Sequence, residues 1–151
     1  MLIPGIYGMK NVKWITRIEV VDYDFKGYWM QRGWSDRATY QTSSRIDVPK
    51  DRATLQPGEV TLAGVAFAGD RGIDKVEVSL DDGQTWQEAQ IKPGLSQNAW
   101  NLWALKATLQ AGTYPVKVRA TDGNGDLQTA KLSDPLPDGA TGYHSVLLRV
   151  G

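Results

Sequence analysis

The chain contains no cysteine and a single histidine among its 151 residues. The missing thiol excludes disulfide bonds, thiolate metal ligands and a cysteine nucleophile. Neither sign of charge is in excess, because 17 basic residues balance 17 acidic ones. No long-range field therefore draws this protein to nucleic acid or to an anionic membrane, and neither is an expected partner.

Long hydrophobic runs are also missing. No apolar stretch approaches the ~20 residues that span a bilayer. The first residues meet Pro4 and Gly5 at once and lack the basic and apolar regions of a signal peptide. We therefore expect no membrane contact by this segment, and we expect any export signal or anchor to lie outside this sequence.

Few residues are suited to catalysis or metal binding. His144 lies at the start of the predicted last strand, where packing or turn capping is its expected role, and one imidazole without a thiol cannot complete a typical zinc site. Residues 122–126 are similar to the opening of an EF-hand loop. However, Leu127 stands where that loop needs glycine, and Ser133 stands where it needs glutamate. We therefore predict a glycine turn there, and no catalytic or metal-binding residue in this chain.

The chain divides into two pieces of different pattern. Residues 1–44 mix aromatics, charges and glycines, with one alternating stretch at 12–21 that predicts a half-buried strand. From residue 45 the pattern is that of β-strands throughout, and no amphipathic helix is indicated. The expected strands occupy residues 59–68, 73–80, a return strand from Trp86, 100–109, 113–121, 127–132 and 143–150.

The patterning within these strands predicts their surroundings. Residues 59–68 are apolar on both faces, as in a strand enclosed by two layers. In residues 73–80, Val76 and Val78 should point inward and Ser79 outward, and residues 81–83 should form a tight hairpin turn with positive φ. Pro115 lacks an amide donor, which predicts a strand start or a sheet edge.

About seven short strands with turns every 8–12 residues predict an all-β fold. We expect an immunoglobulin-like Greek-key β-sandwich with an irregular N-terminal extension, and without the antibody-type disulfide. Trp14, Trp86 and Trp100 lie on predicted strands, where core packing is the ordinary role. Trp29 and Trp34 lie in irregular chain beside arginines, so they either cover a junction or interface or simply pack.

Three cations, Lys10, Lys13 and Arg17, follow Gly5 and Gly8 closely. They have two interpretations. Either they are the solvated face of an edge strand, or they belong to an anion site. In such a site the glycines allow the backbone to approach the anion closely, and a lysine supplies the positive charge. Residues 8–20 resemble the point where the cofactor domain of sulfite-oxidase-family molybdopterin oxidoreductases meets their C-terminal domain.

The resemblance covers nearly the whole chain. Residues 74–86 are similar to the first hairpin of the molybdenum-cofactor oxidoreductase dimerisation domain, and Trp100, Trp103 and residues 119–122 and 142–146 fit it as well. The resemblance implies that residues 1–44 are the tail of a molybdopterin-binding domain with its connecting segment. It also implies that residues 45–151 are an immunoglobulin-like dimerisation domain.

In that family a short polar-Val-Lys run touches the phosphate-bearing end of the pterin, which implies that Asn11, Val12 and Lys13 are cofactor-binding residues. The implied cofactor is molybdopterin in the parent protein, with none retained by the fragment. The implied partners are a missing N-terminal molybdopterin domain and a second copy in a homodimer. Redox chemistry would occur at molybdenum in the missing domain, so the fragment alone is not expected to be catalytic, and the parent is compatible with a periplasmic or membrane-anchored enzyme.

One departure from the family concerns the substrate. Sulfite-handling members carry an arginine, in an Asn-x-Arg-Gly setting, in the loop before the last strand, whereas residues 134–139 contain no cation. Leu and Pro cannot replace a guanidinium that binds a tetrahedral oxyanion, so either an arginine elsewhere takes this role or the substrate is not sulfite. Two other functions stay open: a free-standing immunoglobulin-like module that binds a glycan or protein through its tryptophans, and a structural module with residues 1–45 disordered in isolation.

Overall fold

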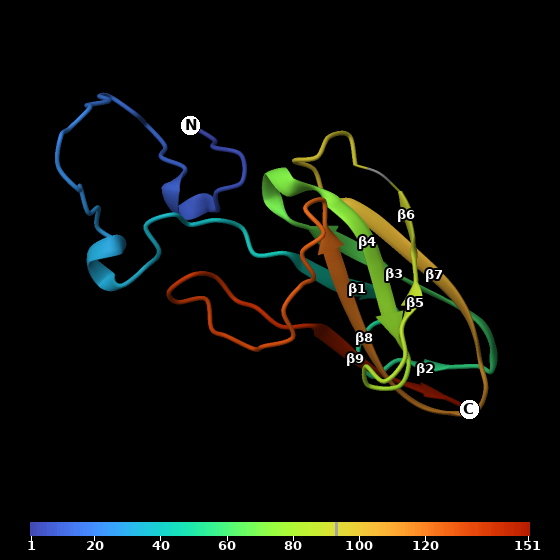
Figure 1. The fold of residues 1–151 in the computed structure, drawn as a ribbon. Helices are drawn as coiled ribbons and strands as arrows, with labels where there is room; N and C mark the ends of the chain where they lie inside the picture. Colours follow the sequence, from blue (N-terminus) through green and yellow to red (C-terminus); the bar gives the residue numbers. More distant parts are fainter. Residues whose placement is uncertain (93) are drawn as a thin grey trace.

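The computed structural model describes residues 1–92 and 94–151. Its strands pack as two sheets (Figure 1), and its three 3-10 turns are η1 (Gly8–Lys10), η2 (Met30–Arg32) and η3 (Gly69–Arg71). The strands are β1 (Ser43–Val48), β2 (Thr54–Leu55), β3 (Gly58–Phe67), β4 (Ile73–Ser79), β5 (Gln87–Glu88), β6 (Gln90–Lys92), β7 (Asn101–Leu109), β8 (Gly112–Asp122) and β9 (His144–Val150).

The strand orders are β1-β3-β7-β6 in one sheet and β2-β9-β8-β4-β5 in the other. This is the arrangement of the immunoglobulin sandwich, whose two sheets have the orders A-B-E-D and G-F-C. The predicted fold class is confirmed. The described residues form nine strands where about seven were predicted. Strands β1 and β2 were not among those predicted, the return strand from Trp86 forms two short pieces, β5 and β6, and the strand at residues 127–132 does not form.

The core lies between the two sheets, and every second side chain along each strand points into it. Leu62 of β3, Val76 and Val78 of β4, and Val116 and Val118 of β8 are fully buried. Burying each such side chain contributes roughly 1.5–3 kcal/mol relative to exposure. The inward prediction for Val76 and Val78 is confirmed.

Trp103 is the tryptophan of the core, with a side chain almost completely buried. It stands opposite Gly64 in the β3–β7 register. A Cβ on Gly64 would lie 2.9 Å from the Trp103 ring and 1.9 Å from the carbonyl oxygen of Arg45 on β1. The missing side chain therefore lets β1 approach β3 while the indole fills the space. The core prediction was wrong for Trp14 and Trp100, whose side chains are exposed.

Ser79 stands opposite Lys117 on the outer face of the sheet, as predicted, but it is buried there and not exposed to solvent. Its hydroxyl donates to the Asp81 carboxylate (2.7 Å) and accepts the amide N–H of Gly83 (2.7 Å), which makes it part of the turn after β4. Asp82 and Gly83 have the predicted positive φ values of 62° and 95°. The connection is longer than a tight hairpin, however, because β5 begins only at Gln87.

Two further local predictions are wrong. Pro115 is neither at a strand start nor on an edge strand. It lies inside the central strand β8. The pairing of β4 with β8 ends at Ser79 and Lys117, before Pro115 is reached, so Pro115 leaves no carbonyl oxygen of β4 without a donor. Residues 127–132 form no strand, and only an isolated bridge joins Leu127 to Thr121.

The predicted strand at residues 12–21 is also wrong. Trp14 is 95% exposed and Val20 is 97% exposed, and no strand pairs with this stretch anywhere in residues 1–92 or 94–151. An alternating sequence becomes a strand only when a neighbouring strand accepts its backbone hydrogen bonds.

The described residues also include no helix long and apolar enough to cross a membrane.

Candidate functional site

Residues 8–37 form an excursion that leaves the sandwich and returns to it, drawn in blue in Figure 1. Two antiparallel segments close its base. The amide of Tyr7 donates to the carbonyl oxygen of Ala38 (2.8 Å), and the amide of Tyr40 donates to that of Gly5 (3.0 Å). Ala38 is fully buried at this base. The excursion is therefore anchored at both ends to one end of the sandwich.

Glycines allow the base of the excursion to lie directly against η3. Gly5 has a φ of +77°, and a Cβ on it would lie 2.5 Å from the carboxylate of Asp70. A Cβ on Gly69 would lie 3.1 Å from the Cα of Gly5. Gly5 is buried in this junction and is not presented to a ligand.

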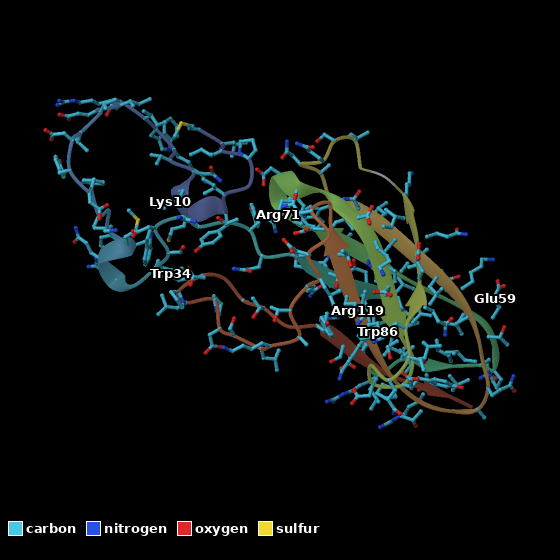
Figure 2. The ribbon with its side chains drawn as sticks, viewed as in Figure 1. Lys10, Trp34, Glu59, Arg71, Trp86 and Arg119 are labelled. Carbon is cyan, nitrogen blue, oxygen red and sulfur yellow. The ribbon has the colours of Figure 1, made fainter. Side chains whose placement is uncertain are left out.

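A buried ion pair fixes the same junction. The Nε of Arg71 donates to Asp122 Oδ2 (2.7 Å), and its Nη2 donates to the carbonyl oxygen of Tyr40 (2.9 Å). Thr42 donates its hydroxyl to the same carboxylate oxygen (3.0 Å). Figure 2 places Arg71 at the end of the sandwich that faces the excursion. The contact therefore ties η3, β8 and the returning chain together.

Asp122 ionises in spite of its burial. Desolvation raises its pKa, but hydrogen bonds from Arg71 and Thr42 and from the amides of Asp126 and Asn124 outweigh this effect and lower the pKa overall. The two amides donate to Oδ1 at 3.1 Å each. The predicted glycine turn at residues 122–126 is thus confirmed, with its leading carboxylate engaged in local bonds.

The loop before β9 packs on the excursion. The carbonyl oxygen of Pro137 accepts the amide of Ser35 (3.0 Å), and that of Asp138 accepts the side-chain amide of Gln41 (3.0 Å). A hollow of about 490 Å³ lies between residues 33–41 and this loop, and Arg37 contributes its cation. The loop itself supplies no positive charge to the hollow.

The three cations near the start of the excursion have different surroundings. The Nζ of Lys10 lies 3.0 Å from the thioether of Met30, and Arg17 pairs with Glu19 at 2.8 Å. The exposed Lys13 ammonium has neither an ion-pair nor a hydrogen-bond partner within the described residues. Lys13 is therefore the cation of this group that is available to an anion.

Asn11 shapes the turn that leads to Lys13. Its side-chain Oδ1 accepts the amide of Ile3 (2.9 Å), and its backbone amide donates to the carbonyl oxygen of Gly8, the first residue of η1 (3.0 Å). The amides of Val12 and Lys13 donate to no acceptor in residues 1–92 and 94–151. Two unengaged amides and one ammonium group are thus adjacent along the exposed chain, and groups of these kinds donate hydrogen bonds to phosphate.

The aromatics of the excursion partly pack on one another. Trp29 contacts Tyr28 and Trp34 edge-on, with ring centroids 4.9 and 6.4 Å apart, and the guanidinium of Arg32 lies 3.5 Å from the Tyr28 ring centroid. Tyr28 and Trp29 nevertheless stay exposed. Figure 2 shows Trp34 and Lys10 on the excursion, away from the sandwich.

A second cluster lies on the outer face of the five-stranded sheet and was not foreseen. The guanidinium of Arg119 lies 4.1 Å from the Trp86 ring centroid and bonds Glu77 at 2.9 Å, and Tyr143 meets Trp86 edge-on at 5.6 Å. Figure 2 shows Arg119 and Trp86 side by side. Trp86 is therefore a surface residue stacked with an arginine, and its predicted core role is wrong.

His144 makes a structural contact, but one between strands and not the predicted packing or turn capping. Its Nδ1 accepts the amide of Ile46 (3.2 Å) and so links β9 to β1. Among the described residues, no group of three histidine, cysteine, aspartate or glutamate side chains could hold a metal ion.

Comparisons with known proteins give the same picture as the sequence resemblance. The model of the family described as Mo-co oxidoreductase dimerisation domain matches residues 36–137, and that of the oxidoreductase molybdopterin binding domain matches residues 1–29. Mitochondrial sulfite oxidase of Homo sapiens is 33% identical over 153 residues, which cover 85% of this chain and 28% of that protein. Sulfite oxidase of Gallus gallus is 32% identical over 152 residues, which cover 85% of this chain and 33% of that protein.

A solved structure shares the fold. The sulfane dehydrogenase SoxCD from Paracoccus pantotrophus superposes with a TM-score of 0.61 over 71% of this chain and 30% of that chain, at 23% identity. The chain spans only about a third or less of the length of these relatives. The family match includes more than half of the residues and confirms the resemblance in the sequence. The chain therefore belongs to the Mo-co oxidoreductase dimerisation domain family of the sulfite-oxidase type.

Proposed function

We propose that this chain is the C-terminal part of a molybdopterin-dependent oxidoreductase of the sulfite oxidase family. Residues 1–44 would complete the cofactor domain and connect it to the sandwich, and residues 45–151 would contact a second subunit. The match of residues 1–29 to the molybdopterin-binding family supports this division. Molybdopterin, when bound, supplies the redox centre. The residues of this chain bind its edge and position the domains.

The donor set at Lys13 carries the proposal. A phosphate carries negative charge and several acceptor oxygens, and it accepts bonds from ammonium groups and backbone amides. The Lys13 ammonium and the amides of Val12 and Lys13 offer such bonds and have no other partner in the described chain. Asn11 holds the turn through its bond to Ile3. These residues fit the phosphate-bearing end of a pterin cofactor.

The exposed stretch at residues 12–21 supports the same proposal. Trp14, Ile18 and Val20 have largely exposed side chains, and contiguous exposed apolar surface marks an interaction site. Pairing with a sheet of the cofactor domain would bury this face and satisfy the backbone. A free-standing module that binds glycans would also expose aromatics, but the family match of residues 1–29 favours burial against the cofactor domain.

The test uses the full-length protein that the proposal implies. We expect Lys13→Ala to lower the molybdenum and pterin retained per polypeptide, because a charge-assisted phosphate contact contributes roughly 1.5–3 kcal/mol. That energy corresponds to cofactor binding about ten- to a hundredfold weaker. Cofactor is quantified by elemental analysis and by pterin fluorescence after dialysis.

Lys50→Ala is the matched control, because it removes the same charge from an exposed position in the sandwich. The control should retain the cofactor as the parent protein does. Equal retention in Lys13→Ala and Lys50→Ala would contradict the proposed contact.

A further inference from the structure

The glycine turn that follows β8 contains the asparagine–glycine pair Asn124–Gly125. The chain has four asparagines, and the other three precede Val12, Ala99 and Leu102. Asparagine is a chemically labile residue, above all before glycine, because glycine has no Cβ to hinder an attack by its own nitrogen. The structure leaves this side open as well, since no atom beyond the chain neighbours lies within 4 Å of the place that a Cβ on Gly125 would occupy.

The side chain of Asn124 is not held by the fold. It is exposed, and its amide group takes part in no hydrogen bond within the described chain. Asn11 and Asn101 differ, because each accepts a backbone amide through its side-chain oxygen, at 2.9 Å and 3.1 Å. A side chain that is bound in this way does not turn toward the nitrogen of the next residue. Asn124 can do so.

The Gly125 nitrogen is engaged, but only at the surface. In the folded turn its N–H donates to the carbonyl oxygen of Asp122 (2.9 Å), and this bond must open before the nitrogen can attack. Residues 123–126 are all exposed, so water can replace the lost acceptor. Exposed backbone bonds of this kind open at little cost in free energy. The reaction is therefore open to the folded protein as well as to the unfolded chain.

We propose that Asn124 is a site of spontaneous deamidation, and that the modification loosens the junction between the sandwich and the excursion. The Gly125 nitrogen forms a bond to the side-chain carbonyl carbon of Asn124. The side-chain nitrogen leaves as ammonia with the proton that Gly125 gives up. Water then opens the cyclic imide at either carbonyl, which yields aspartate or isoaspartate at position 124. The proposal does not depend on the proposed function.

Asp122 transmits the modification to the junction. Its Oδ1 accepts the amides of Asn124 and Asp126 at 3.1 Å each, and its Oδ2 accepts the Nε of Arg71 at 2.7 Å. Isoaspartate routes the backbone through the side-chain carbon and lengthens it by a methylene group, which displaces the Asp126 amide. Either product also adds a carboxylate next to Asp122, and a nearby like charge disfavours its ionised form. Both effects weaken the bond that Arg71 makes at the base of the excursion.

The test follows the intact gene product during incubation at neutral and mildly alkaline pH, with tandem mass spectrometry of each asparagine. We expect the deamidated fraction at Asn124 to grow with time, and to grow faster at the higher pH because the Gly125 nitrogen must lose its proton. Asn98 is the matched internal control. It also lies exposed in a turn without a side-chain hydrogen bond in the described residues, but it precedes Ala99, so it should stay unmodified.

The effect on the junction has its own measurement. Ion exchange separates the modified protein by its added charge, and mass spectrometry then follows its amide hydrogen exchange. We expect faster exchange in the peptides that contain Tyr7 and Tyr40, whose amides close the base of the excursion, and no change in those of β3. Asn124→Gln keeps the amide group but must close a larger ring. The incubated variant should therefore exchange as fresh wild-type protein does.

Each part of the proposal can fail separately. An Asn124 that stays unmodified in the folded protein would overturn it, and conversion there in urea would show that the folded turn protects the residue. Equal conversion at Asn98 would overturn the role of the glycine. Modified protein with unchanged exchange at Tyr7 and Tyr40 would overturn the effect on the junction. The comparison of Asn124 with Asn98 uses wild-type protein alone, so it does not require that any variant folds.

Discussion

Replacing Arg71 by alanine should destabilise the protein strongly and loosen the N-terminal excursion. Arg71 is 19% exposed and Asp122 only 2%, so the pair is largely withdrawn from water. The substitution removes the 2.7 Å bond to Asp122 and the 2.9 Å bond to the carbonyl oxygen of Tyr40. It leaves a buried carboxylate without its cation.

The size of the effect follows from what remains around Asp122. Removing one partner of a buried ion pair costs about 3–5 kcal/mol. The carboxylate keeps the hydroxyl of Thr42 and the amides of Asn124 and Asp126, which offset part of the loss. We therefore expect the free energy of unfolding to fall by about 2–4 kcal/mol, which corresponds to a Tm lower by roughly 5–15 °C for a chain of this length.

Urea denaturation and calorimetry measure this loss of stability. A double-mutant cycle that combines Arg71→Ala with Asp122→Asn isolates the coupling energy between the two side chains. Arg17→Ala is the control, because Arg17 and Glu19 are just as close (2.8 Å) but 76% and 58% exposed. Exposed pairs contribute about 0–1 kcal/mol. If Arg71→Ala lowers the free energy of unfolding by less than about 1 kcal/mol, or if the double-mutant cycle shows no coupling, the claim that this buried pair stabilises the fold is refuted.

Two other expectations concern the sandwich. Val76→Ala should cost ~1–3 kcal/mol through lost burial and a cavity, measured by urea denaturation, and a change near zero would mean that β4 does not pack as described. The hydroxyl and amide of Thr85 and the hydroxyl of Ser79 lower the pKa of Asp81 from 3.8 to about 2. Since the folded pKa is the lower one, the stability from this carboxylate is present above pH 3.8 and lost as the pH falls toward 2. Thr85→Ala should raise this pKa toward 3.8, and an NMR titration with no such rise would contradict the turn geometry.

The regular part of the fold could be predicted from the sequence because local alternation and turn chemistry agree there. The strands at residues 59–68, 73–80, 100–109, 113–121 and 143–150 all form within a few residues of their predicted bounds. Those at 12–21 and 127–132 do not form, since alternation alone supplies no neighbouring strand. The division at residue 44 stays a prediction.

The tryptophans show another limit of the sequence pattern. Trp103 is the core indole because it faces Gly64 across the sheet. Trp100, three residues earlier, precedes β7, borders the outer face of the same sheet and is exposed. Which of two nearby tryptophans a sheet buries depends on the register with the next strand, and that register is set over long sequence separations.

The candidate site was predictable in part. Lys13 could be singled out only because Asn11, Val12 and Lys13 resemble a family motif, and its role stays a proposal. The Arg71–Asp122 pair was missed because its members are 51 residues apart, and no local pattern signals such a contact.

The most direct test of the whole account is the molybdenum and pterin content of the intact gene product, purified from its native host. The account predicts a molybdopterin cofactor bound in stoichiometric amount. A well-folded product that contains neither molybdenum nor pterin would contradict it.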